Sequence, residues 1–467
     1  MFLTGNFLLG ITVLVIFYFF ALNLLYIILV VISYRSIRKF RDVDSIFNMT
    51  GVYSTNLYKP VSIIAPAYNE EQSIIASVNA LLNIRYANFE VIVVNDGSSD
   101  KTLQELIDYF RLKPDNRYRP AFLDHKPIRQ IYSSPRYPAL VVVDKENGRK
   151  ADALNAGINM ASKELICAVD ADSILEPDVI VKMLRVFMED EKTVAVGGVV
   201  RMANGCTYKH RMIDQIRLPK SWLGRVQAVE YLRSFLFGRV GWDSLDALMV
   251  ISGAFGVFDR NAVIRAGGYL HDTVGEDMEL VVRLHKYHRQ NNLPYRIRFI
   301  FEPVCWTEVP EDYKTLSRQR NRWHRGLADT LYRHRDMLFR PAYGRVGTIA
   351  MPYFLIGELL APLVELSGFF IVALSWWLGA INISFALLFL SFSIVLGMIL
   401  SLSAVLLEEM TSKRYERATD ILILALYAFL ENIGYRQLHA WWRIRGLVDF
   451  LRGKRDWGVM VRKGIKT

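Results

Sequence analysis

Asp170 and Asp172 are two carboxylates with the spacing and position of a divalent-metal site. They directly follow an apolar segment, residues 165–169, that is typical of a buried strand. Hard cations such as Mg²⁺ or Mn²⁺ bind carboxylate oxygens together with phosphate oxygens. A metal that bridges a diphosphate would neutralise the charge developing on a leaving group. Because Asp-x-Asp is also common by chance, a metal site and a chance occurrence are equal alternatives here.

A second acidic pair, Glu276 and Asp277, precedes a helical pattern over residues 278–286. A carboxylate in this place could act as a general base that removes a proton from an attacking hydroxyl. It could also be a helix cap, since acidic side chains favour the first turn of a helix. Taken by itself, the pair favours the cap.

Two further positions are suited to a nucleotide. Asp96 follows the apolar segment 89–94 and precedes Gly-Ser-Ser, so it could accept hydrogen bonds from a base or a ribose. The alternative is a turn with an N-capping side chain. Lys150 and Asp152 open a helical pattern and could bind a phosphate and the nucleotide; an ordinary charged first turn is the alternative there.

Gln319, Arg322 and Trp323 form a Gln-x-x-Arg-Trp motif in a charged segment flanked by long hydrophobic runs. Trp323 offers a flat face for a sugar ring, and Arg322 offers a cation for a diphosphate. An amphipathic helix with a snorkelling arginine and an interfacial tryptophan is the alternative. The motif gains weight only from the carboxylates that precede it.

These residues must be positioned by alternating strands and helices. Strand patterns cover residues 61–65, 89–94, 140–143 and 165–169, and helical patterns cover 71–82, 102–110 and 151–161. Apolar strands that alternate with helices predict an α/β domain with a parallel sheet covered on both faces. Ligands bind beyond the carboxyl ends of such strands, where the polar clusters fall. Residues 111–138 are predicted to be a loop region.

The order of the motifs resembles that of the membrane-bound family 2 glycosyltransferases, which include cellulose, chitin, hyaluronan and poly-N-acetylglucosamine synthases. The resemblance covers roughly residues 60–330. It is carried by Pro66 to Glu70, Val94 to Ser98, Lys150 to Asn155, Asp170 to Asp172, Glu276-Asp277 and Gln319 to Trp323. Each motif is weak, but six in the same order are specific.

The resemblance implies a GT-A (Rossmann-like) fold, a UDP-sugar donor, Mg²⁺ or Mn²⁺ as cofactor, and inversion at the anomeric carbon. Asp96 and Asp152 would hold the uridine, Asp170 and Asp172 would serve the metal and diphosphate, and Asp277, beside Glu276, would be the base. The remaining residues that it implies are Tyr68, Glu70 and Lys150 for the donor, Gln319, Arg322 and Trp323 for the diphosphate and the acceptor, and Ser252 and Gly253 for the acceptor.

The tail contains a segment around Trp457 and Arg462 that loosely resembles the gating loop of these synthases. It departs from the loop patterns Phe-x-Val-Thr-x-Lys and Trp-Gly-Thr-Arg. A basic interfacial tail anchored by tryptophan is an equal alternative.

Composition indicates a membrane protein. The chain is 52% hydrophobic and has a net charge of +11. Residues 7–33 are long enough to cross a bilayer, and basic residues follow from Arg35 to Arg41, which places residues from about 35 onward in the cytosol. The positive charge lies beside the hydrophobic runs, so membrane lipids and nucleotide phosphates explain it better than nucleic acid does.

Further hydrophobic runs cover residues 349–378 and 381–407, and the run 421–430 is short enough for a re-entrant or interfacial helix. Three spans are expected, with a fourth left open. Glu358 and Glu365 would share one helical face in the second span. They could line a path for a sugar chain or make structural polar contacts. A small membrane subunit or self-association is a hypothesis.

We therefore predict four parts. Residues 1–34 form a retained N-terminal transmembrane helix, and 35–340 a cytosolic GT-A domain with interfacial helices. Residues 341–410 form two transmembrane helices, and 411–467 a re-entrant or interfacial helix with a basic tail. The predicted function is processive synthesis and export of a β-linked polysaccharide at the cell membrane. A glycolipid synthase acting on a membrane lipid is the alternative, and a non-catalytic scaffold is a lesser one.

Overall fold

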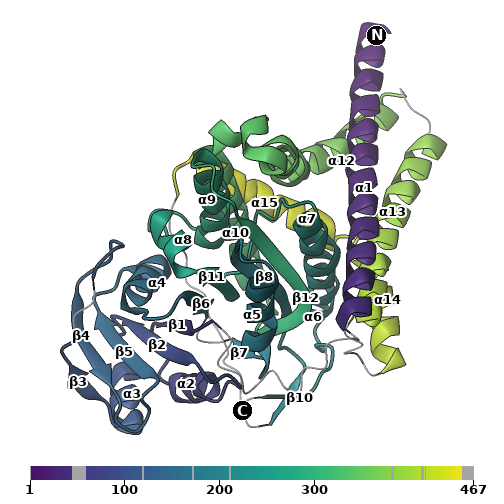
Figure 1. Cartoon of the computed structure of the whole chain (residues 1–467). Coiled ribbons are helices and arrows are strands. Elements are labelled where there is room, and N and C mark those ends of the chain that lie inside the picture. Colours follow the sequence, from purple (N-terminus) through teal and green to yellow (C-terminus); the bar gives the residue numbers. More distant parts are fainter. Residues whose placement is uncertain are drawn as a thin grey trace. The chain divides into compact units, whose positions relative to one another are not determined.

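The computed structural model describes residues 2–44, 59–117, 120–170, 173–209, 212–379, 383–411, 415 and 417–454. The chain forms two compact units (Figure 1). Of the described residues, those within 40–216 and 245–309 form the first unit, here called the sheet unit. Those within 2–39, 217–244 and 310–454 form the second, here called the helical unit. Three residues predicted to be functional, Asp172, Trp457 and Arg462, lie outside the described residues.

The sheet unit is built on a mixed sheet with the strand order β3-β4-β5-β2-β1-β6-β11-β8-β12-β7 among the described residues. The strands are β1 (Val61–Ala67), β2 (Phe89–Asp96), β3 (Lys113–Asp115), β4 (Ile128–Ser133), β5 (Leu140–Lys145), β6 (Leu165–Val169), β7 (Ile174–Leu175), β8 (Thr193–Met202), β11 (Phe255–Asp259) and β12 (Arg296–Thr307). A separate hairpin pairs β9 (Thr207–Lys209) with β10 (Met212–Gln215).

The centre of the sheet is parallel, as predicted: β5, β2, β1 and β6 run in one direction. Their residues are almost all buried, which explains why they appear in the sequence as continuous apolar runs. The prediction is thus confirmed for the four strands on which it was based. The whole sheet is mixed, because β4 pairs antiparallel to β5, and β11 pairs antiparallel to both β6 and β8. Residues 111–138 are also not simply loop, since they contain β3 and β4. These strands lie at the half-exposed edge, where the apolar pattern is weak.

Helices join the strands of this unit. They are α2 (Ile74–Leu82), α3 (Thr102–Phe110), α4 (Arg149–Met160), α5 (Val179–Glu189), α8 (Arg260–Arg265) and α9 (Glu276–Gln290). Helix α4 is buried from Ala151 to Met160 and packs on β1 and β2. Its Gly157 lies so close to the sheet that an added Cβ would be 2.3 Å from Ile64 Cγ2. The amino end of α4 is thereby fixed beside the carboxyl ends of β2 and β5.

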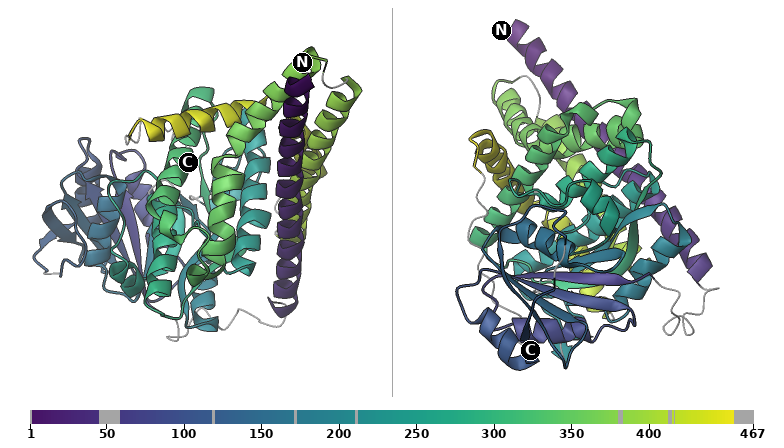
Figure 2. Two further views of the ribbon diagram at one scale, coloured as in Figure 1. Left: turned by 90° about the horizontal axis from the view of Figure 1, so that it is seen from above. Right: turned by 60° about the vertical axis from the view of Figure 1, so that its left-hand side comes forward.

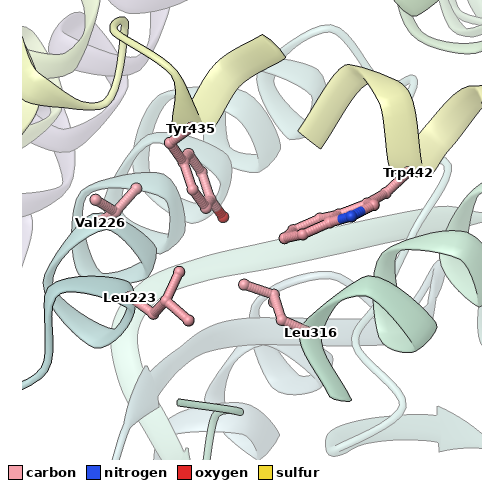
Figure 3. Packing of buried hydrophobic residues seen from close by; sticks show 5 residues of the cluster. All are labelled: Leu223, Val226, Leu316, Tyr435 and Trp442. Carbon is pink, nitrogen blue, oxygen red and sulfur yellow. The ribbon is translucent and has the colours of Figure 1, made fainter. Parts of the chain in front are cut away.

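The helical unit contains most of α1 (Phe2–Asp44), a single helix of 43 residues (Figure 2). Its other long helices are α6 (Trp222–Leu232), α10 (Tyr313–Arg333), α12 (Ala361–Trp377), α13 (Ile383–Thr411), α14 (Ala418–Leu430) and α15 (Tyr435–Leu451). Short helices complete it: η2 (Arg233–Arg239), α7 (Val240–Ser244), η3 (Arg335–Met337), η4 (Pro341–Tyr343), η5 (Val346–Ala350), α11 (Met351–Tyr353) and η6 (Phe354–Leu359). A buried cluster of Leu223, Val226, Leu316, Tyr435 and Trp442 ties α6, α10 and α15 together (Figure 3).

Two described helical segments are long and apolar enough to cross a membrane, Val13–Lys39 and Ile394–Thr411. Two bent pairs pass the same test jointly: Val346–Leu359 with Ala361–Trp377, bent by 43°, and Ala418–Leu430 with Tyr435–Leu451, bent by 62°. The predicted run 349–378 corresponds to the first bent pair, and the predicted run 421–430 falls within the second. By length and composition, the two single segments, Val13–Lys39 and Ile394–Thr411, are therefore candidate membrane helices.

The glutamates predicted to share a helical face are both paired with arginines of α15. Arg443 Nη2 lies 3.0 Å from Glu358 Oε2, and Arg436 Nε lies 3.4 Å from Glu365 Oε1. Tyr353 also donates a hydrogen bond to Glu358 at 2.8 Å. These contacts favour the alternative in which the two glutamates join helices over the one in which they line a sugar path.

Candidate active site

The loops after β1 and β2 are tied to each other by hydrogen bonds. The Asn69 N–H donates to Ser98 Oγ at 3.0 Å, and the Ser99 N–H donates to Asn69 Oδ1 at 2.8 Å. The Glu70 N–H donates to Thr102 Oγ1 at 2.8 Å. This part of the predicted donor motif thus holds two loops in a fixed relation. Glu70 accepts a hydrogen bond from Ser73 Oγ at 2.6 Å, whereas Tyr68 is 52% exposed.

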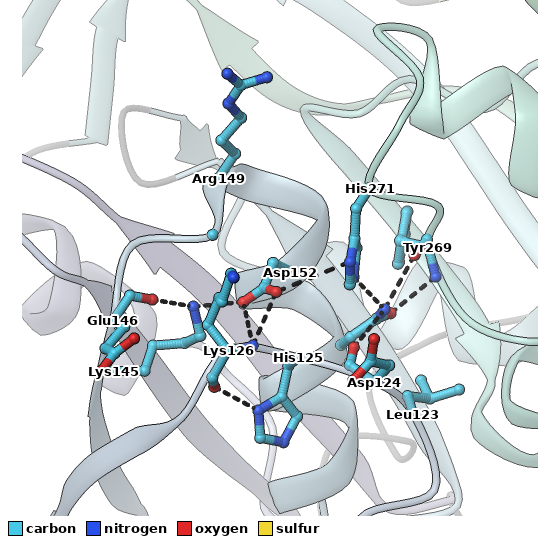
Figure 4. A network of polar contacts seen from close by, with 12 residues as sticks. Leu123, Asp124, His125, Lys126, Lys145, Glu146, Arg149, Asp152, Tyr269 and His271 are labelled. Carbon is cyan, nitrogen blue, oxygen red and sulfur yellow. Dashed lines mark hydrogen bonds and ion pairs between the residues drawn. The ribbon is translucent and has the colours of Figure 1, made fainter.

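Asp96 and Asp152, predicted to hold the nucleotide, both pair with the ammonium of Lys145. Figure 4 shows the contact between Lys145 and Asp152. Lys145 ends β5 and is the register partner of Asp96 at the end of β2. Its Nζ lies 2.6 Å from Asp96 Oδ1 and also forms an ion pair with Asp152. The main-chain N–H groups of Gly148 and Arg149 donate to Asp96 at 3.0 and 2.8 Å. Both carboxylates are therefore fixed in place before any ligand binds.

The network continues from Asp152 to neighbouring loops (Figure 4). The Lys126 N–H donates to Asp152 Oδ2 at 2.9 Å, and His271 Nδ1 lies 3.9 Å from the same carboxylate oxygen. Asn155 Nδ2 lies 3.1 Å from His271 Nε2. The sequence reasoning missed Lys145, Lys126 and His271. For Lys145 a signal was present, because a lysine directly after a buried apolar strand is unusual unless the lysine is paired.

A second group of charges surrounds Gly253. The Lys150 ammonium donates to Gly253 O at 2.9 Å and lies 2.5 Å from Asp170 Oδ1. The Gly253 N–H donates to Asp277 Oδ2 at 3.1 Å. The structure thus brings together four residues predicted separately from distant motifs: Lys150, Asp170, Gly253 and Asp277. An added Cβ on Gly253 would lie 3.2 Å from Lys150 Nζ and 3.3 Å from Asp277 Oδ2, so the glycine permits this close approach.

The negative charges around Lys150 favour the protonated form of its side chain. Burial opposes the ammonium of Lys150, but the carboxylates of Asp170, Glu276 and Asp277 outweigh burial and raise the pKa of Lys150. Lys150 is therefore a stable cation suited to a phosphate. Burial, followed by the negative charge of Glu276, raises the pKa of Tyr269, so its hydroxyl stays neutral.

These residues line a small pocket. Its polar wall includes Lys150, Ser252, Gly253, Glu276 and Asp277, and Tyr269 also lines it. Asp277 lies in the first turn of α9, as predicted, with its Oδ1 accepting the Met278 N–H at 2.8 Å. The pocket therefore combines a lysine ammonium with a carboxylate that the main chain holds in place.

Asp170 pairs with Lys150 of this pocket and could contribute to a metal site. Among the described residues, no group of three or more His, Cys, Asp or Glu side chains could hold a metal ion. Mg²⁺ and related ions need only one or two protein carboxylates when substrate phosphates supply the other oxygens. The Asp170 carboxylate, 24% exposed and facing Lys150, fits such a partial site.

Gln319, Arg322 and Trp323 lie on α10 in the helical unit. Gln319 is buried, and its Oε1 has no hydrogen-bond partner within the described part of the chain. Trp323 is 43% exposed, with the Arg320 guanidinium 4.4 Å from its ring centroid. Arg320 is in turn paired with Glu230 at 2.9 Å. The motif therefore carries an exposed aromatic face that a buried ion pair supports.

The mixed sheet with acidic groups at its strand ends defines a GT-A-type domain. The same fold occurs in a solved structure, the mannosyltransferase PcManGT from Pyrobaculum calidifontis in complex with GDP-Man and Mn²⁺. The two chains superpose with a TM-score of 0.53 and share 18% sequence identity, over 92% of this chain and 99% of that one. The predicted α/β GT-A fold is confirmed.

The sequence pattern described as "Glycosyl transferase family group 2" matches residues 165–430, and that of "Glycosyl transferase family 2" matches residues 62–121. The first match alone covers more than half of the chain, so this protein belongs to the family 2 glycosyltransferases. The prediction of a glycosyltransferase is confirmed, and the scaffold alternative is set aside.

Among curated proteins, the chain is similar to the poly-β-1,6-N-acetyl-D-glucosamine synthase of Staphylococcus aureus, with 30% identity over 274 residues, 58% of this chain and 56% of that protein. The synthase of the same name from Staphylococcus epidermidis is 28% identical over the same length. The chain thus spans about half the length of the curated relatives it matches.

Proposed function

We propose that the protein transfers a sugar from a UDP-sugar, with inversion, to a growing β-linked polysaccharide. The observation that carries this proposal is the arrangement around Gly253, which holds a carboxylate, Asp277, and a cation, Lys150, on the two polar groups of one residue. A base for the acceptor and a charge for the leaving diphosphate are thus available at one pocket.

In the proposed reaction an acceptor hydroxyl attacks the anomeric carbon while Asp277 takes its proton. Each oxygen of Asp277 already accepts one main-chain hydrogen bond, which fixes the carboxylate and leaves a second lone pair on each oxygen. The bond to the UDP oxygen breaks as the new bond forms on the opposite face, and this inverts the configuration. Lys150 stabilises the negative charge on the departing diphosphate.

Asp170, together with Asp172, would hold the divalent cation, either Mg²⁺ or Mn²⁺. When bound, the cation would neutralise diphosphate charge as the sugar leaves. The Mn²⁺ recorded with the mannosyltransferase that shares the fold supports the choice of a divalent ion.

The other predicted residues would bind the two substrates. Asp96 and Asp152 would accept hydrogen bonds from the uridine, with Tyr68 and Glu70 nearby on the β1 loop. Ser252 and Gly253 would border the acceptor, Gln319, Arg322 and Trp323 would bind the diphosphate and the acceptor sugar, and Trp457 and Arg462 would close over the donor.

We further propose that this is a multi-pass protein of the cell membrane. It would have the four parts predicted from the sequence, with residues 35–340 in the cytosol. Its partners would be membrane lipids and, by hypothesis, a small subunit or a second copy, but not nucleic acid. The similarity to poly-N-acetylglucosamine synthases supports N-acetylglucosamine as the first sugar to test and export of a polymer as the outcome. A glycolipid synthase that makes one or a few transfers is the alternative.

The test is UDP release by detergent-purified protein across a panel of UDP-sugars with Mg²⁺ or Mn²⁺, with products sized on a gel. We expect release with one donor and a product that lengthens with time. A product of fixed size that extracts into chloroform would move the assignment to glycolipid synthesis. Absence of release with every donor would contradict the proposal.

A further inference from the structure

Lys145 is a fully buried lysine that no motif singles out. Its side chain is 0% exposed, whereas lysine is almost never buried without a partner. Its ammonium has three N–H groups and three acceptors: Asp96 Oδ1 at 2.6 Å, Glu146 O at 2.5 Å, and Asp152 Oδ1. The lysine is therefore completely satisfied by the protein, and it has no N–H left for a ligand.

Main-chain N–H groups also hold the two carboxylates that Lys145 joins. Asp96 Oδ2 accepts the Arg149 N–H at 2.8 Å, and Asp152 Oδ2 accepts the Lys126 N–H at 2.9 Å. On each carboxylate, Oδ1 accepts Lys145 and a main-chain N–H, from Gly148 at 3.0 Å for Asp96 and from Lys126 at 3.2 Å for Asp152. Each Oδ2 accepts one main-chain N–H, so a second acceptor position remains there for a ligand.

We propose that Lys145 is a positioning residue for the donor nucleotide. It holds Asp96 and Asp152 side by side, so that both present acceptor lone pairs to N–H or O–H groups of a nucleoside. This inference rests on the proposed function, which assigns the nucleoside diphosphate to these two carboxylates.

Removal of the ammonium would leave two buried like charges beside each other. The two carboxylates would then repel each other and move apart, and this displacement removes acceptors from the nucleotide site. The contacts of Lys150 and Asp277 run through Gly253 and do not involve Lys145. Loss of Lys145 should therefore weaken donor binding far more than it slows transfer at saturating donor.

The experiment compares full-length wild type with Lys145→Gln in detergent, by calorimetric titration with UDP and by kinetics with the active UDP-sugar. We expect the UDP Kd and the donor KM to rise about 10-fold or more, as loss of hydrogen bonds to charged groups predicts, with kcat changed less than about 3-fold. Lys145→Arg, which keeps the charge, should recover part of the affinity. Lys192→Gln, at an exposed lysine, is the matched control and should bind UDP as the wild type does.

A folded Lys145→Gln variant with the wild-type UDP Kd would overturn the inference. If this variant is not recovered folded, Asp152→Asn is compared with Asp152→Asn/Lys145→Gln, which removes one charge of each sign. A Kd at least about 3-fold weaker in the double variant supports positioning of Asp96 by Lys145, and equal Kd values overturn it. Wild type that binds no UDP would instead refute the proposed function and the inference with it.

Discussion

The sheet unit contains two groups in which a lysine pairs with aspartate, and the two groups differ in how far their side chains are buried. Lys145 with Asp96 and Asp152 is almost completely buried, and Lys150 with Asp170 is about one-fifth exposed, at 19% and 24%. In the first group every N–H of the ammonium has a protein acceptor. In the second group, Lys150 lines the pocket. The difference separates a lysine whose ammonium is satisfied within the protein, Lys145, from a lysine that lines a pocket, Lys150.

The largest effect should come from Asp277→Asn. Removal of the proposed base should lower kcat by about 10²- to 10⁴-fold, because an amide cannot take the proton of the acceptor hydroxyl. Donor KM and the thermal midpoint should change little. Glu276→Gln, at the neighbouring position, should lose less activity. Near-normal kcat in Asp277→Asn would refute the base assignment.

Two single variants, Asp96→Asn and Asp170→Asn, test the difference between the two groups. Asp96→Asn should lower the free energy of unfolding by about 1.5–3 kcal/mol, the range for hydrogen bonds to charged groups. Asp170→Asn should change it by about 1 kcal/mol or less, since its ion pair is partly exposed. The activity of Asp170→Asn should fall and should need more divalent metal. Thermal unfolding measures the stability of each variant, and metal titrations measure the metal requirement of Asp170→Asn. A larger loss of stability in Asp170→Asn than in Asp96→Asn would contradict the proposed difference between the two groups.

A moderate effect is expected for Gly253→Ala. The new Cβ would lie 3.2 Å from Lys150 Nζ and 3.3 Å from Asp277 Oδ2, so one of them must shift by a few tenths of an ångström. We expect kcat/KM to fall about 10-fold, within what a small misplacement can do. Gly10→Ala is the control, because a Cβ there meets nothing within 4 Å. Equal kcat/KM values in both variants would contradict the tight packing at Gly253.

The smallest effect concerns pH. The raised pKa of Lys150 means that the folded state holds this proton more tightly than the unfolded state does. Its contribution to stability is complete below the ordinary value of 10.5 and is lost only as pH rises through the higher folded value. The difference in thermal midpoint between wild type and Lys150→Met should therefore be constant from about pH 7 to 9.5. A difference that shrinks within that range would show that the carboxylates do not stabilise the ammonium.

Helix α3 and strand β6 match their predicted ranges residue for residue, because a helical apolar pattern marks α3 and a continuous apolar run marks β6. Burial alone is not sufficient, since strand β8 is buried throughout and was not predicted. Strands β3 and β4, at one end of the sheet, were missed because their half-exposed side chains form no apolar run.

For the candidate site, the sequence identified side chains but not their neighbours. Lys150, Asp170 and Asp277 were singled out from separate motifs, and the structure places all three around Gly253. Lys145 was missed because its partner Asp96 lies 49 residues away along the chain, on a neighbouring strand whose register the sequence does not specify. Their catalytic and binding roles stay predictions.

The two arginine–glutamate pairs between α15 and the η6–α12 segment have a practical use. Glu358 and Glu365 are seven residues apart, as are Arg436 and Arg443, so the segments can form both pairs only in one antiparallel alignment. Insertion of a single alanine within α12, between Ala361 and Glu365, would rotate the Glu365 carboxylate by about 100° around the axis of α12 and break its pair with Arg436. Insertion of a whole number of turns would preserve the face but shift the spacing. Transfer activity measured across a short series of insertions in this segment would therefore show how strictly sugar transfer depends on the alignment of the helices.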